Sequence, residues 1–228
     1  MNLLPTLVVP ASAAALVGSA YLAAAGFPFV SNQRRRGFPV SNLFYFWATL
    51  ASFLIVSAVG FLTNPYTVWG LPPVGALVGL TMLFIVSVRT DFTIHKIPKE
   101  PCWIVFWFGL IAFTSALLTG LVVWDVPQIA TAGMLAIFPL AAFLSAMFGA
   151  GGGADFRVAL ASFAVTFWWV DFNSIAWGLL AFIILALVGR FFFPHKTPKG
   201  KKMAPAGPAY IAVFLVPAFV TYAQVPLF

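Results

Sequence analysis

The sequence predicts an all-α integral membrane protein, and three observations lead to that prediction. Of its 228 residues, 62% are hydrophobic and only 7% are charged, whereas soluble proteins carry roughly 25% charged residues. The mean hydropathy is +1.03. Apolar residues fill whole segments without alternating wet and dry faces, which suits lipid but would expose large apolar patches in water. These properties exclude an ordinary soluble domain.

Apolar runs interrupted by Pro, Gly and charged residues predict about eight transmembrane helices. Most reach the roughly 20 residues that about 30 Å of hydrocarbon requires at 1.5 Å per residue. The sixth is short, because its start merges with a glycine-rich run. No basic residue precedes the first apolar run, so we interpret it as a retained helix and not as a cleaved signal peptide. The predicted spans are residues 5–27, 43–62, 71–89, 103–123, 129–149, 156–170, 175–193 and 207–225.

The basic residues orient these spans. All twelve Lys and Arg residues fall at the connections that follow spans one, three, five and seven, and none falls at the other connections. Because cytoplasmic loops carry the excess of Lys and Arg, this distribution predicts both termini on the outer side and four basic cytoplasmic loops. We expect a multi-pass protein of the plasma or inner membrane. The basic residues that give the chain its formal charge of +7 are then expected to face anionic lipid headgroups. We expect no nucleic-acid partner.

Only five residues are acidic, and two of these have unusual positions. Asp125 and Asp171 lie in short outer loops, where we expect solvated turn residues. Glu100 lies in the second cytoplasmic loop, and its simplest role is a charge partner for basic neighbours. Asp91 and Asp155 lie at the cytoplasmic ends of long apolar spans, where an ionisable group is costly unless it is paired or hydrated. These two acids are therefore the candidates for chemistry.

Two carboxyl groups in a partly dry site suit the hydrolysis of a peptide bond. Like charges a few ångströms apart cannot both ionise comfortably, so one group keeps a proton. The ionised member takes a proton from water, while the protonated member polarises the scissile carbonyl. The single cysteine, Cys102, excludes an internal disulfide and a multi-cysteine zinc site. The two histidines have no acidic cluster around them, so we expect neither a metal nor a cofactor.

The segments around the two acids have a distinctive composition. Asp91 is followed six residues later by Ile97, Pro98 and Lys99. Glycine before Asp155 permits positive φ and close backbone approach, so an extended substrate could lie against it. That second segment reads Gly151-Gly152-Gly153-Ala154-Asp155-Phe156-Arg157, and the two acids are 64 residues apart.

Together the two segments resemble the type IV prepilin peptidases and their archaeal preflagellin relatives, a family of GxGD-type membrane aspartyl proteases. That family has an Asp followed six residues later by Ile-Pro-Asn, and a Gly-x-Gly-Asp followed by x-Lys. The separation of the acids is similar to the family's. The resemblance covers roughly residues 85–225. It includes a segment similar to the Pro-Phe-Gly-Pro-Ala that opens the family's last helix, here Pro205-Ala206-Gly207-Pro208-Ala209.

The resemblance implies an aspartic endopeptidase with Asp91 and Asp155 as its catalytic pair. It implies that the substrate is a pilin-like or archaellin-like precursor, which loses a short leader peptide at the cytoplasmic membrane face. A peptidase-like core of about residues 71–225 would follow an N-terminal two-helix extension of about 1–70, within one membrane domain of residues 1–228. The resemblance also implies that flanking residues shape the site: Gly151, Gly152, Gly153, Ala154, Arg157, Ile97, Pro98 and Lys99.

The chain departs from the family pattern in three places. Lys99 replaces the usual Asn, and Ala154 replaces the second Gly. The short loop 31–42 stands where many larger bacterial members have a cytoplasmic domain with paired CxxC motifs. The sequence therefore indicates a peptidase-only form and does not support the family's companion activity, N-methylation of the new terminus.

Two other interpretations stay open. Presenilin and signal-peptide-peptidase type proteases also use Gly-x-Gly-Asp, and Pro208-Ala209-Tyr210 is similar to their Pro-Ala-Leu element; however, their first acid follows Tyr, whereas Asp91 follows Thr90. A transporter or a non-enzymatic assembly protein would also hold acids in the membrane. Transporters place such acids near the bilayer midplane within broken helices, whereas both acids here are expected at one rim. The sequence makes no prediction about oligomeric state.

Overall fold

The computed structural model describes residues 29–63, 71–118, 120, 122, 124–148, 152–196 and 202–224. This part of the chain is almost entirely helical, as the sequence predicts, and the first predicted span, 5–27, lies outside it. Its elements are α2 (Phe29–Arg35), α3 (Asn42–Thr63), α4 (Leu71–Ile94), α5 (Lys99–Leu118), α6 (Val126–Met147), α7 (Gly153–Thr166), the 3₁₀ helix η1 (Phe172–Ser174), α8 (Ile175–Phe192), the short strands β1 (His195–Lys196) and β2 (Lys202–Met203), and α9 (Gly207–Gln224).

Five of the described helices are long and apolar enough to cross a membrane, namely α3, α4, α5, α6 and the η1–α8 segment. The chain is therefore a helical protein with the properties of a membrane protein. Two further helices, α7 and α9, coincide with predicted spans but are shorter. At 1.5 Å per residue, the 14 residues of α7 extend only about 21 Å, well short of the hydrocarbon thickness.

Several observed helix ends differ from the predicted ends: α5 ends at Leu118 and α7 at Thr166, before the predicted ends at 123 and 170. Other helices are extended by polar residues. The helix α4 runs five residues beyond the predicted end of its span, so Asp91 lies in its last turn. The helix α5 begins at Lys99, four residues earlier than predicted, and includes Glu100 and Pro101 in its first turn. Proline is tolerated there because the first N–H groups of a helix have no intrahelical partner.

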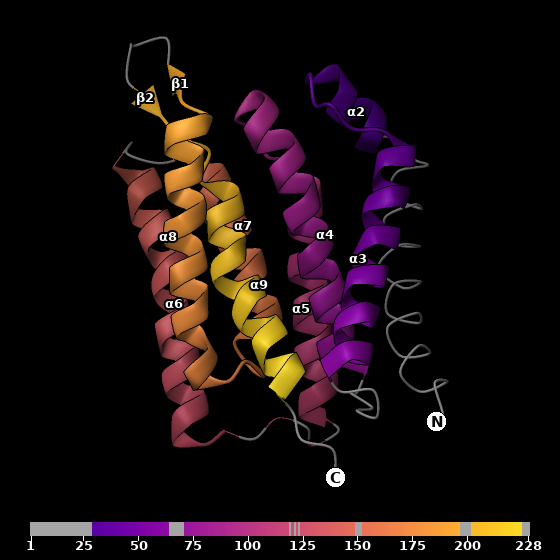
Figure 1. Cartoon of the computed structure of the whole chain (residues 1–228), viewed down its shortest axis with the longest axis vertical. Helices are drawn as coiled ribbons and strands as arrows, with labels where there is room; N and C mark the ends of the chain where they lie inside the picture. The colour runs from indigo at the N-terminus through magenta and orange to yellow at the C-terminus, as the bar shows by residue number, and fades with distance from the viewer. Residues whose placement is uncertain are drawn as a thin grey trace.

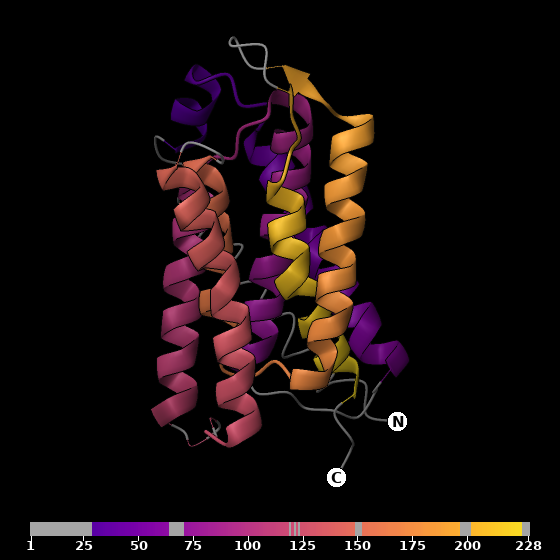
Figure 2. The ribbon, with the colours of Figure 1, turned by 90° about the vertical axis from the view of Figure 1, so that its left-hand side faces the viewer.

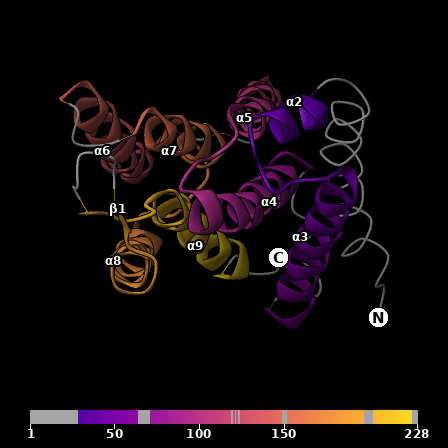
Figure 3. The ribbon, with the colours of Figure 1, turned by 90° about the horizontal axis from the view of Figure 1, so that it is seen from above.

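The helices form two packed rows. Viewed along the helix axes, α8, α9, α4 and α3 form one row, and α6, α7 and α5 form the other (Figure 3). The helices α4 and α9 pack against each other within the first row, and both also pack against α7 in the second row. This arrangement brings the end of α4 and the starts of α7 and α9 together.

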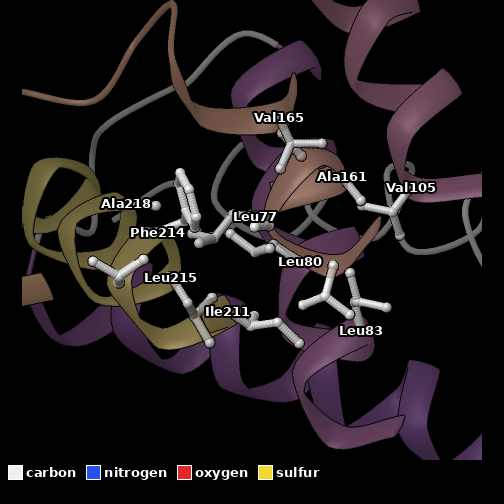
Figure 4. Packing of buried hydrophobic residues seen from close by; sticks show 14 of the residues in the cluster. Leu77, Leu80, Leu83, Val105, Ala161, Val165, Ile211, Phe214, Leu215 and Ala218 are labelled. Atoms are coloured by element: carbon white, nitrogen blue, oxygen red, sulfur yellow. The ribbon is translucent and has the colours of Figure 1, made fainter. Parts of the chain in front are cut away.

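The core lies between these rows. Its close-packed side chains come from α4, α5, α7 and α9, and include Leu77 and Leu80, which are fully buried (Figure 4). Helices also approach closely where one of them carries glycine. A Cβ on Gly178 of α8 would collide with the Val213 carbonyl oxygen and the Pro217 ring of α9. Small residues permit such contacts in membrane proteins, where packing and not the hydrophobic effect holds helices together.

The described basic connections lie at one end of the bundle. The α2–α3 turn, the α4–α5 loop, the start of α7 and the β1–β2 pair occupy the same end, drawn at the top in Figures 1 and 2. The other end has two of the acids as helix caps. Asp125 accepts a hydrogen bond from the Gln128 N–H at 2.8 Å, and Asp171 accepts one from the Asn173 N–H at 2.9 Å. Both are therefore structural caps and not merely solvated turn residues.

Candidate functional site

Asp91 lies where α4 stops. The N–H of His95 donates to the Asp91 carbonyl oxygen at 2.9 Å, and His95 has a φ of 53°. A left-handed residue directly after a helix ends it by turning the chain away. The four-residue connection from His95 to Pro98 then leads directly into α5. This turn leaves the Asp91 side chain in the last helical turn, facing the start of α9.

The Asp91 carboxyl is held by the backbone of α9. Its Oδ2 accepts a hydrogen bond from the N–H of Gly207 at 3.0 Å, across 116 residues of sequence. Gly207 is the first residue of α9, where N–H groups lack intrahelical partners and the helix dipole favours a negative charge. With only 6% of its surface exposed, Asp91 is buried and oriented by a helix start.

The contact requires glycine at position 207. A Cβ there would collide with Ile97 Cδ1 and would lie 3.0 Å from Ser87 Oγ and 3.1 Å from Asp91 Oδ2. Ser87 lies one turn before Asp91 on α4, fully buried. Ile97 is buried as well, and it closes this side of the carboxyl. The last turn of α4, the α4–α5 loop and the start of α9 therefore fit together without space for another side chain.

Asp155 lies in the first turn of α7, as its third residue. Its Oδ2 accepts a hydrogen bond from the Gly152 N–H at 3.2 Å, and its own N–H donates to the Gly152 carbonyl oxygen at 3.0 Å. This is one half of a capping box: the Asp155 side chain satisfies the N–H of the cap residue, while Gly152 has no side chain to return the bond. Both candidate acids are therefore bound to backbone N–H groups at the start of a helix.

The two acids lie in one region although α4 and α7 are distant in the sequence. The charge of Asp155 acts on Asp91, and Asp155 also interacts electrostatically with Tyr210 of α9. Tyr210 lies one turn after Gly207, and its ring packs edge-on against Phe182 of α8 at a centroid distance of 5.4 Å. The site thus combines the end of α4 with the starts of α7 and α9.

The described glycines before Asp155 do not adopt positive φ. Gly152 is extended, with φ −91° and ψ 143°, and Gly153 begins α7. The nearest heavy atoms to an added Cβ lie at 3.7 Å for Gly152 and 3.9 Å for Gly153, which are ordinary contact distances. Neither the backbone geometry nor the packing of the chain requires glycine here. What these residues provide is open space beside Asp155; Gly151 lies outside the described residues.

A cavity of about 590 Å³ lies between the two predicted motifs. The aspartates themselves are not in its wall, which is formed by their neighbours in sequence and by the α2–α3 turn. Most of the polar groups in it are basic, so it suits a ligand that presents carbonyl oxygens or negative charge. Its wall consists of Arg36, Phe38, His95, Lys96, Ile97, Lys99, Gly152, Gly153, Ala154 and Arg157.

Most of the predicted site-shaping residues meet at this cavity. Ile97, Lys99, Ala154 and Arg157 all line it, and the Nε of Arg157 is buried without a hydrogen-bond partner among the described residues. Pro98 is buried behind the wall, where its carbonyl oxygen accepts from Cys102 Sγ at 3.5 Å. The fold therefore brings the two motifs together at this cavity. The N–H at Arg157 Nε is available there to donate a hydrogen bond to a ligand.

Glu100 does not pair with a sequence neighbour. It is 7% exposed and forms an ion pair with Arg36 at 3.0 Å, while its other oxygen accepts from Gln33 Nε2 at 3.3 Å. Gln33 in turn accepts from the Tyr45 hydroxyl at 2.7 Å. This Glu100 network joins α5 to α2 and α3, and it fixes Arg36 in the wall of the cavity.

Several residues of the site were not identified from the sequence. Gly207 stands within a quoted motif, but its bond to Asp91 could not be read from it. Ser87 and Arg36 carried no signal, and Tyr210 was noted only within Pro208-Ala209-Tyr210, because each reaches the site through packing between distant segments. Among the described residues, no three His, Cys, Asp or Glu side chains gather closely enough to hold a metal ion.

Comparisons with known proteins find no family model, no characterised protein and no solved structure that matches this chain. A function must therefore be inferred from the residues of this chain and their arrangement.

Proposed function

We propose that this protein is a membrane aspartyl endopeptidase that removes short leader peptides from pilin-like or archaellin-like precursors. Asp91 and Asp155 are its catalytic pair. One observation carries the proposal: two rare acids from segments 64 residues apart lie in the last turn of α4 and the first turn of α7, two helices that pack against each other and against α9. The cavity beside them is lined by the residues that the two sequence motifs single out.

The proposal includes the orientation of the chain in the membrane. Eight spans place both termini on the outer side and the catalytic pair at the cytoplasmic face of the plasma or inner membrane. The gathering of the described basic connections at one end of the bundle supports this orientation, since cytoplasmic loops carry the excess of Lys and Arg. The β1–β2 pair and the α2–α3 turn then lie on the cytoplasmic side with the site.

The proposed mechanism uses each carboxyl through one oxygen. The backbone N–H groups of Gly207 and Gly152 hold Oδ2 of Asp91 and Asp155, respectively. This leaves Oδ1 of each acid for water or for the scissile carbonyl. The ionised acid takes a proton from the attacking water while the protonated acid gives its proton to the carbonyl oxygen. When the tetrahedral intermediate breaks down, the first acid passes its acquired proton to the leaving amine, and the second recovers its proton from the hydroxyl that becomes the new carbonyl. Arg157 lies close enough to Asp155 to interact with its charge, and it can stabilise the carboxylate.

The positions of the acids favour a hydrolase over a transporter. Asp91 lies in the last turn of α4 and Asp155 in the first turn of α7, whereas proton-coupled transporters hold acids near the middle of broken helices. The open space at Gly152 and Gly153 supports a peptide substrate, because an extended backbone could approach Asp155 there.

The test is cleavage of a pilin-like precursor by the purified protein in detergent. Asp91→Asn and Asp155→Asn each keep size and polarity but remove a titratable group, so each is expected to reduce cleavage at least a thousandfold, as loss of a catalytic group typically does. Matched controls are Asp125→Asn and Asp171→Asn at the other end of the bundle. Asparagine is an equally good helix cap, so these controls should retain cleavage.

Two outcomes would contradict the proposal. Retained cleavage in both Asp91→Asn and Asp155→Asn would exclude an aspartyl mechanism. Equal loss in the control variants would mean that the substitutions act through folding. Thermal unfolding of all four variants distinguishes that case from a loss of chemistry.

A further inference from the structure

A second cavity lies along the outer face of α5 and shares Arg36 and Lys99 with the wall of the candidate-site cavity. It has a volume of about 600 Å³ and is formed by α2, α4 and α5. We call it the α5 groove. Trp103, Trp107 and Ile111 line its length, and they are 41%, 59% and 67% exposed. Because α5 is long and apolar enough to cross a membrane, these exposed apolar side chains face lipid.

The α5 groove is polar at one end only. Asn32, Arg36 and Lys99 line that end, beside the start of α5. From Lys99 to Ile111 the helix rises by about 18 Å, which is close to the roughly 15 Å depth of one hydrocarbon leaflet. The groove therefore has the length and the polarity of a single phospholipid, with a headgroup level at Lys99 and an acyl-chain level from Trp103 to Ile111.

The charges at the polar end favour an anionic headgroup. Among the described residues, Glu100 is the only acid in the wall of the groove, and it is buried and already bound to Arg36 and Gln33. The Lys99 ammonium and the Asn32 amide are exposed donors at the same end. Arg36 pairs with Glu100 through one terminal nitrogen, which leaves its other terminal nitrogen to donate to a second group. Phosphate oxygens match this set of donors.

We propose that the α5 groove is a binding site for one anionic phospholipid. Its phosphate binds Lys99, Arg36 and Asn32, and one acyl chain lies along Trp103, Trp107 and Ile111. Basic pockets between helices on the cytoplasmic side are where anionic headgroups are held. This site does not depend on the proposed peptidase activity.

The size of the α5 groove favours a lipid over a membrane-spanning peptide. A helix about 10 Å in diameter would occupy on the order of 1,400 Å³ over about 18 Å of length. This is more than twice the volume of the groove. An acyl chain is much thinner than a helix, and it requires only the apolar wall that Trp107 and Ile111 provide.

The test uses quenching of tryptophan fluorescence by brominated lipids in vesicles that contain the whole protein. Brominated phosphatidylglycerol in a phosphatidylcholine bilayer should quench more strongly than the same fraction of brominated phosphatidylcholine. The double variant Trp103→Phe/Trp107→Phe should remove most of this excess, because both tryptophans line the acyl-chain level of the groove. Lys99→Gln should weaken the preference for phosphatidylglycerol about fivefold, the effect of one basic residue at an anionic surface.

Two further variants serve as controls. Lys99→Arg should keep the preference, because it keeps the charge. Arg190→Gln should also keep it: it removes one basic residue from the exposed last turn of α8, away from the α5 groove.

Three results would overturn the site. Equal quenching by the two brominated lipids would exclude headgroup selection, and an excess unchanged by Lys99→Gln would exclude the proposed contact. Loss of the excess on adding an equimolar transmembrane peptide would identify a peptide as the occupant. Unchanged helical circular dichroism in Lys99→Gln is expected, because Lys99 is exposed.

Discussion

The hydrogen bond from the Gly207 N–H to Asp91 depends on the absence of a side chain at position 207. Gly207→Ala would force a methyl group against Ile97, Ser87 and the Asp91 carboxyl. We expect a loss of about 1–3 kcal/mol in the free energy of unfolding, as for other overpacked sites. We also expect at least a tenfold loss of precursor cleavage, because Asp91 is displaced. Denaturant titration in detergent and the cleavage assay measure the two effects.

The matched control for that change is Gly133→Ala, on the exposed face of α6. An added Cβ there meets no heavy atom within 4 Å, and alanine is the better helix former by roughly 1 kcal/mol. Stability should stay the same or rise, with cleavage unchanged. If Gly207→Ala left stability and precursor cleavage unchanged, as Gly133→Ala should, the close packing of Gly207 around Asp91 would be contradicted.

For individual residues, the sequence identifies the two acids but not the groups that bind them. Asp91 and Asp155 were conspicuous because charges are rare in an apolar chain, and their flanking motifs are local. Gly207 binds Asp91 from 116 residues away, and no local pattern contains that contact. The same holds for Glu100. The sequence predicts a basic neighbour as its charge partner, but the buried Glu100 carboxylate pairs with Arg36, 64 residues away.

The helix α2 is joined to α5 by a polar network, beside an apolar cluster that contains Val30 of α2 and against which Ile104 and Phe108 of α5 pack. Glu100 accepts from Arg36 and Gln33, so Glu100→Ala leaves two donors without an acceptor. We expect this change to cost about 2–3 kcal/mol. Arg36→Ala should cost a similar amount, because it leaves a carboxylate buried without its counter-charge.

A double-mutant cycle tests this connection. The double variant should lose less than the sum of the two single losses, by more than about 0.5 kcal/mol. Glu100→Ala should also increase tryptic cleavage at Arg34, Arg35 and Arg36, because α2 is no longer held. Additive losses with unchanged proteolysis would show that the ion pair does not attach α2.

Hydropathy predicts the helices but not all of their ends: polar residues extend α4 and the start of α5, while α5 ends at Leu118 and α7 at Thr166, five and four residues before the ends of the predicted spans. Every predicted span from 43–62 onward coincides with one helix. The start of α5 was placed four residues late, because Glu100 and Pro101 were assigned to a loop. In the structure Glu100 is buried by α2 and α3, and that contact stabilises the first turn. The short length of α7 was anticipated, since the glycine run at its start is not apolar.

The orientation of the whole molecule can be tested with its single native cysteine in place. Cys102 is buried, so labelling by a membrane-impermeant maleimide should have a low background. Arg190→Cys lies at the basic end of the bundle, and Val126→Cys, 80% exposed, lies at the opposite end. Arg190→Cys should be labelled only in inside-out vesicles, and Val126→Cys only in right-side-out vesicles. The reverse pattern would invert the proposed topology and move the acids to the outer face.

The bond between Asp91 and Gly207 also has a mechanical consequence. The donor is a backbone amide, so whether it reaches the carboxyl depends on the position of α9 along its own axis as well as on the space that Gly207 leaves. Gly178 and Pro217 hold α9 in close contact with α8, so the two helices should slide as a unit. A displacement of this helix pair would therefore lengthen or break the hydrogen bond to Asp91. The environment of the acid would change although neither aspartate is substituted.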